Sequence, residues 1–157
     1  MRLIISVLLV ALVNPLAHAQ TTPADFQKAI QDYSIAIATN AKDTGALSGR
    51  AIAYEAIGRD LLAVQDLSAL IKVNPKSAFA FERRATIYFR MEEFARAGSD
   101  YAAAAFLDPK NAAALYGLGF TQRMDRFNPP ESADRNIAAA QAIQPDIAER
   151  MAERGVK

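Results

Sequence analysis

Apolar side chains recur along most of this chain at spacings of three and four residues, which is the period of an amphipathic helix. Proline, glycine or asparagine interrupts the pattern at intervals. No segment shows the strict apolar–polar alternation of a strand. The pattern therefore predicts an all-α protein, with helices at residues 23–39, 46–57, 60–73, 77–91, 93–107, 111–124, 131–143 and 146–154.

Much of this pattern recurs at one fixed interval, which is the spacing between Pro75 and Pro109. The third unit is displaced by two residues, because its proline falls at Pro145. We place this two-residue insertion in the turn between the paired helices, at residues 127–130. Residues 23–39 match the second helix of a unit, so the array begins with a half unit. A period of this length indicates stacked helical units.

The repeated positions carry a large residue, a small residue, Tyr, then Ala, a large residue and Pro. They are Leu47, Ala51, Tyr54, Ala63, Leu67 and Pro75, then Phe81, Ala85, Tyr88, Ala97, Tyr101 and Pro109, then Leu115, Gly119, Ala133, Ile137 and Pro145. This pattern resembles the tetratricopeptide repeat. The consensus Trp is absent, and Gln122 replaces the third Tyr.

The resemblance implies an α-solenoid over residues 20–157. It consists of a half repeat (23–41), three repeats (44–77, 78–111 and 112–145) and a short capping helix (146–157). Arrays of stacked repeats need a polar cap on the last unit. We expect Ile147, Ala148 and Met151 on the inner side of the cap, and Glu149, Arg150, Glu153 and Arg154 on its polar side.

Residues 1–19 form a separate segment with the features of a secretory signal peptide. Arg2 precedes a nearly all-apolar run over positions 3–13, and the small residues Ala17 and Ala19 come just before Gln20. A membrane-spanning helix needs roughly 20 apolar residues, so this run is short for an anchor. We expect cleavage after Ala19 and export, to the periplasm in a Gram-negative cell or secreted otherwise. An uncleaved anchor or a buried first helix is the alternative.

The amino-acid composition argues against several classes of partner and of catalytic site. Lys plus Arg (18) nearly equals Asp plus Glu (17), which gives no electrostatic reason to expect nucleic acid or an anionic membrane as partner. Cys is absent, and the single His lies in the predicted leader. We find no phosphate-binding loop, metal-ligand cluster or nucleophile motif, so we expect no catalytic residue, metal or cofactor. Catalysis by carboxylates alone remains an alternative.

In the family, the first helix of each pair lines a concave face that binds a partner. One stripe on these helices carries aromatic residues that the repeat pattern does not require. Aromatic and Arg side chains often dominate the energy of an interface. The candidate partner-binding residues are Phe79, Glu82, Thr86, Phe89, Arg90, Tyr116, Phe120 and Arg123. Alternatively, neighbouring first helices pack on one another and bury part of this stripe.

Some family members hold acidic C-terminal peptides with a clamp of Lys, Asn and Arg. Of the corresponding positions in this chain, only Arg83 has a suitable charge, so we do not expect this mode. These positions are Ser48, Ile52, Arg83, Ala113 and Gly117.

Acidic and basic side chains also recur at the repeat interval. Arg50 and Arg84 are separated by one such interval, and so are Asp32, Asp66 and Asp100 in succession. We favour charged pairs between helices, or solvated charges, over a row of ion-binding sites. Residues 127–130 are interpreted as a longer turn, with a recognition loop as the alternative.

The pattern as a whole favours a non-enzymatic protein–protein interaction module of the cell envelope, an adaptor or assembly factor that binds a protein or peptide. One alternative is a structural or self-associating subunit whose groove is permanently covered, for example in a homo-oligomer. The other is a carboxylate-dependent cell-wall enzyme.

Overall fold

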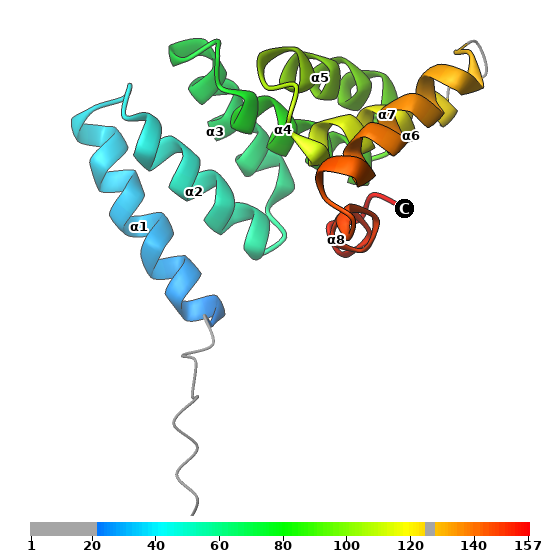
Figure 1. The fold of residues 1–157 in the computed structure, drawn as a ribbon. Coiled ribbons are helices and arrows are strands. Elements are labelled where there is room, and N and C mark those ends of the chain that lie inside the picture. Colours follow the sequence, from blue (N-terminus) through cyan, green and yellow to red (C-terminus); the bar gives the residue numbers. More distant parts are fainter. Residues whose placement is uncertain (1–21, 125–127) are drawn as a thin grey trace, which may run out of the picture.

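The computed structural model describes residues 22–124 and 128–157, and these residues form eight α-helices and no strand (Figure 1). The predicted all-α solenoid is confirmed. The predicted signal peptide and Phe127 lie outside the described residues. The helices are α1 (Pro23–Thr39), α2 (Thr44–Ala56), α3 (Asp60–Val73), α4 (Ala78–Arg90), α5 (Phe94–Leu107), α6 (Ala112–Met124), α7 (Pro130–Ile143) and α8 (Ile147–Glu153).

The first helix of each repeat begins at an equivalent capping residue. Asp43, Ser77 and Asn111 follow one another at the repeat interval. Each side chain accepts a hydrogen bond from the backbone N–H three residues later, at 2.9, 3.2 and 2.9 Å. Such a bond satisfies one of the free N–H groups at a helix start. In α7, Pro130 takes the first helical position, where proline is tolerated.

The turn inside each of the first two repeats contains a residue with positive φ. Gly58 ends α2 with a φ of 71°, and Glu92 holds the equivalent position after α4 with a φ of 61°. Glycine adopts this conformation without strain, whereas a side chain makes it costly. The turn that the two repeats share therefore holds Glu92 at a positive φ, although a residue with a side chain prefers a negative φ.

Consecutive helices pack against one another along the whole array, and α4 also contacts α6 directly. Ala63, Ala85 and Ala97 are fully buried, as close packing of paired helices requires. Among residues 22–124 and 128–157, no helix is long and apolar enough to cross a membrane.

Two glycines allow an aromatic ring to lie directly on the neighbouring helix. A Cβ on Gly49 would lie 2.3 Å from Cζ of Tyr33, and one on Gly117 would lie 2.3 Å from Cζ of Tyr101. These two pairs occupy the same repeat positions, two repeat intervals apart. Each ring thus takes the space that a side chain at the glycine would fill.

A pair of equivalent arginines ties three consecutive helices together. Arg50 of α2 donates two hydrogen bonds to the Asp66 carboxylate of α3, at 2.8 and 2.7 Å, and one to Ser34 Oγ of α1, at 3.0 Å. This hydrogen bonding to Asp66 raises the pKa of Arg50. Bidentate pairs of this kind are strong and fix geometry.

Arg84 repeats this arrangement one unit later. It donates to Asp100 at 2.7 and 2.9 Å and to Ser68 Oγ at 2.9 Å. Asp66 and Asp100 therefore pair between helices, as favoured above, and Asp32 pairs with Lys28 at 2.7 Å on the surface. In the third repeat, a hydrogen bond from Asn136 to Gln122, at 2.9 Å, joins α7 to α6.

We predict that Gly49→Ala lowers the free energy of unfolding by about 1–3 kcal/mol, because the methyl group overlaps the Tyr33 ring. Gly45→Ala is the matched control in the same helix, where the nearest atom is Asp43 Oδ1 at 3.3 Å, and we expect a smaller loss there. Tyr33→Leu should recover part of the loss. Urea unfolding measures all three, and equal stability of the two Gly variants would contradict the packing argument.

Candidate interaction surface on the concave face

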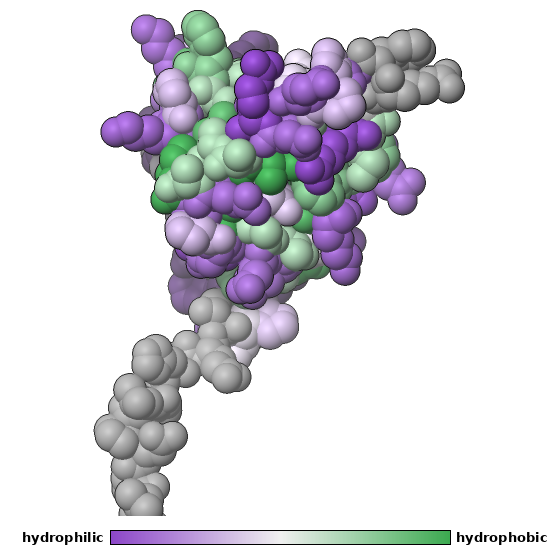
Figure 2. Space-filling view, turned by 45° about the vertical axis from the view of Figure 1, so that its right-hand side comes forward, coloured by the Kyte–Doolittle hydropathy of each residue, from purple (hydrophilic) through white to green (hydrophobic). Residues whose placement is uncertain are grey.

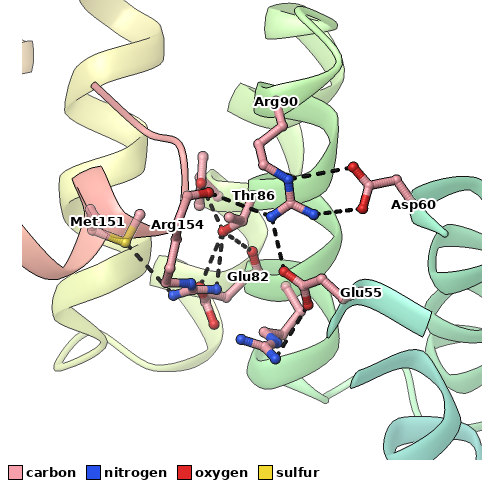
Figure 3. A network of polar contacts seen from close by, with 9 residues as sticks. Glu55, Asp60, Glu82, Thr86, Arg90, Met151 and Arg154 are labelled. Atoms are coloured by element: carbon pink, nitrogen blue, oxygen red, sulfur yellow. Dashed lines mark hydrogen bonds and ion pairs between the residues drawn. The ribbon is translucent and has the colours of Figure 1, made fainter. Parts of the chain in front are cut away.

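The inner side of the array is lined by α2, α4 and α6, and the C-terminal end of the same chain lies against it. Helix α8 packs against α6, and the residues after it reach α4 (Figures 1 and 3). The predicted capping helix is present. Its inner residues Ile147 and Met151 are buried and Ala148 is half-buried, as expected.

Arg154 corrects the assignment of the polar side of this helix. Its guanidinium Nη2 lies 2.7 Å from Glu82 Oε1 and donates to Thr86 Oγ1 at 3.2 Å. The local pattern placed Arg154 in solvent, but Gly155 follows with a φ of 87° and turns the chain. A side chain at Gly155 would collide with Arg90, since a Cβ there would lie 2.8 Å from Arg90 Cγ.

Glu82 is a carboxylate with only 6% of its surface exposed. A buried carboxylate is stable only when it is paired and hydrogen-bonded. Arg154 supplies the opposite charge, with its Nη2 2.7 Å from Oε1. Arg154 thus neutralises a buried negative charge of the concave face.

Thr86 is fully buried, and its hydroxyl has a complete set of partners. It donates to the Glu82 carbonyl oxygen at 3.0 Å and lies 2.9 Å from the Tyr101 hydroxyl. Burial raises the pKa of Tyr101, which keeps the phenol protonated and able to donate to Thr86. The two lone pairs of Thr86 then accept from Tyr101 and Arg154.

A second group of charges connects α4 with α2 and α3 (Figure 3). Arg90 donates to Asp60 Oδ1 at 2.8 Å and to Glu55 Oε1 at 3.0 Å, and Glu55 Oε2 lies 3.2 Å from Arg83. Arg90 Nη1 also donates to the Arg154 carbonyl oxygen at 3.5 Å. Among the described residues, Arg154 balances the third carboxylate of this network, because Arg83 and Arg90 offset Glu55 and Asp60.

The aromatic stripe lies beside these charges. Phe89 meets Phe120 edge to face at 6.4 Å, and Tyr116 stacks on Phe120 at 5.2 Å. Phe89 and Tyr116 are 5% and 7% exposed, and they belong to the same apolar cluster as Ile147, Met151 and Val156. Packing between first helices, together with the C-terminal segment, therefore buries most of this stripe.

The structure brings most of the candidate residues together and leaves two apart. Phe79 stands at the start of α4, 41% exposed, with the Arg83 guanidinium 5.8 Å from its ring centre. Arg123 is exposed and pairs with Asp134 of α7 at 2.6 Å. The other six lie in one region: Glu82, Thr86, Phe89, Arg90, Tyr116 and Phe120. Partner binding by the set stays a prediction.

This site also contains Glu55, Asp60, Met151 and Val156, which the sequence pattern does not assign to it, and Arg154, which the pattern places on the polar side of the capping helix. One signal was present, since Glu55 lies on the same stripe of α2 that carries Glu82 on α4. Among residues 22–124 and 128–157, no group of three or more His, Cys, Asp or Glu could hold a metal ion.

Comparison with solved structures shows that the fold is that of tetratricopeptide repeat arrays. The crystal structure of MamA is 22% identical, with a TM-score of 0.71, and the match covers 81% of this chain and 73% of that chain. Residues 41 to the end of MamA from Desulfovibrio magneticus RS-1 match at 18% identity and a TM-score of 0.70, over 84% of this chain and 75% of that chain.

The first tetratricopeptide repeat domain of Spaghetti (RPAP3), solved bound to the HSP90 peptide SRMEEVD, is 19% identical with a TM-score of 0.60. The match covers 71% of this chain and 90% of that chain. No protein-family model matches the chain, and a search of curated proteins gives no significant match. The likeness therefore establishes the fold.

We predict that Thr86→Val lowers the free energy of unfolding by about 1–3 kcal/mol, because Tyr101 and Arg154 lose a buried partner. Thr39→Val, at the exposed end of α1, is the control and should change stability by less than about 0.5 kcal/mol. Combining Thr86→Val with Tyr101→Phe should cost less than the sum of the two. Denaturant titration of the four variants decides this, and additive losses would contradict the shared network.

Proposed function

We propose that the protein is an exported, non-enzymatic interaction module of the cell envelope, and that it binds a segment of a partner protein on its concave face. One observation carries this proposal: the concave face already binds polypeptide. Arg90 donates to a backbone carbonyl of the C-terminal segment, and Glu82 pairs with its arginine. The concave face thus has one side chain, Arg90, that binds the backbone of a segment, and another, Glu82, that binds an arginine side chain of the segment.

Two further points support the proposal. A solved domain with the same fold is bound to a peptide, and it covers most of the length of this array. Phe79 and Ile52 are 41% and 38% exposed and extend the candidate surface beyond the covered region, toward α2. Exposed aromatic residues often provide binding energy at interfaces.

Export to the periplasm rests on residues 1–19, with their basic start, short apolar run and small residues before Gln20. An adaptor or assembly factor in this compartment would work by binding alone. The acids of the concave face fit that role, because Glu55, Asp60 and Glu82 are each held by an arginine.

Self-association is the second candidate, because large apolar side chains remain exposed on several helices. They include Ile35, Leu61, Phe79, Phe106 and Ile143. On the face shown in Figure 2, however, apolar areas alternate with polar ones. We favour a partner segment on the concave face, because the contacts of the C-terminal segment identify groups there that bind polypeptide.

We predict that a photo-crosslinking amino acid at Phe79 captures a defined protein when the exported form of this chain is used. The mass of this exported form should correspond to a chain that begins at Gln20. Phe106 on α5 is the matched control, since it is 85% exposed and lies on a second helix of a repeat. Capture at Phe79 should exceed capture at Phe106. Equal capture at both positions would contradict the concave site, and a crosslinked dimer of this chain would favour self-association.

A further inference from the structure

The C-terminal segment fits the concave face through both its backbone and its side chains. Val156 and Met151 are fully buried, and the Val156 N–H donates to the Met151 carbonyl oxygen at 2.9 Å. This bond closes a turn around Gly155, whose φ is 87°. The turn directs the Arg154 side chain toward Glu82 and Thr86, far away in the sequence.

Two features of this segment nevertheless favour its release from the concave face. Helix α8 has seven residues, and a helix of that length is not stable without packing. It packs on α6 and α7 and reaches α4 through Arg154, and a segment with few packing partners commonly opens before the rest of a fold. Release would not disturb the pairs that join α4 to Asp60 and Asp100.

The buried carboxylate determines what can take the place of the segment. Glu82 is paired with Arg154 and lies beside the hydroxyl of Thr86. A replacement without a cation would leave Glu82 buried and unpaired, which costs several times more than a surface contact yields. A replacement with an arginine restores the pair and the bond to Thr86.

We propose, on the basis of the function proposed above, that residues 147–156 mimic the external partner and occupy its place. The partner is a polypeptide segment that presents an arginine to Glu82 and Thr86. It carries an apolar residue three positions before that arginine and another two positions after it, as Met151 and Val156 do. The partner must displace the C-terminal segment, so binding is weaker in the intact protein than in a form whose own segment is released.

The test uses the full chain and a fluorescent synthetic peptide of residues 146–157. In the opened variant, Arg154→Ala with Val156→Asp, the segment loses its charge pair and a buried apolar side chain. Both substitutions lie after helix α8, so they weaken the hold of the segment without changing the helices that form the concave face. The control variant is Arg150→Ala with Lys157→Asp, two exposed positions in the same segment. Circular dichroism establishes that both variants are folded.

Fluorescence polarisation should show that the peptide binds the opened variant at least about tenfold more tightly than it binds the wild type or the control, because the tethered segment competes at high effective concentration. A peptide with Arg154→Gln should bind the opened variant at least about tenfold more weakly. Equal binding of the two peptides, or no binding to the folded opened variant, would overturn the proposal.

Hydrogen exchange on the wild type gives an independent test that does not depend on folding of a variant. The amides of Gly155 and Val156 should exchange at least about tenfold faster than those in the middle of α7. Exchange of both only through global unfolding would identify the segment as a permanent cap and overturn displacement.

Failure of this inference can be told apart from failure of the proposed function. If the peptide does not bind but Phe79 still captures a partner, the mimicry is wrong and partner binding stands. If the peptide binds but Phe79 captures nothing in the exported protein, the proposed function is wrong.

Discussion

One buried carboxylate determines the arrangement of the concave face. Glu82 is 6% exposed in the N-terminal half of α4, and a charge in this position requires a cation. Arg154 provides it, from the far end of the chain. Because the same arginine also bonds to Thr86, and its carbonyl accepts from Arg90, the C-terminal segment is joined to a network that extends to α2 and α3.

The repeat geometry makes this network possible, because it holds α4 from its other side. Arg84 ties α4 to Asp100 of α5 and to Ser68 of α3, as Arg50 ties α2 to its neighbours. These pairs and the close contact of Tyr101 with Gly117 position the Tyr101 hydroxyl against Thr86. The Arg–Asp pairs that recur from repeat to repeat therefore position α4, and with it the contacts of Glu82 and Thr86 with Arg154, which occur once.

The sequence predicted the repeated features because they are local or periodic. Helix spacing and the repeat interval follow from patterns that occur in more than one unit, and the recurrence of Asp66 and Asp100 left pairing between helices as one of two expected outcomes. Arg154 could not be placed in this way. Its position depends on the turn at Gly155 and on a contact with Glu82, in a helix two repeats earlier. Burial of Phe89 and Tyr116 likewise depends on a segment that no periodicity relates to them.

The most direct test of this account is a double-mutant cycle between Arg154→Ala and Glu82→Gln, measured by urea unfolding at two protein concentrations. We predict a coupling free energy of about 1–3 kcal/mol that does not change with protein concentration, because both residues belong to one chain. Coupling near zero would show that Arg154 does not neutralise Glu82 in solution. Coupling that grows with protein concentration would place the arginine of a second copy on the concave face, and either result would contradict the account.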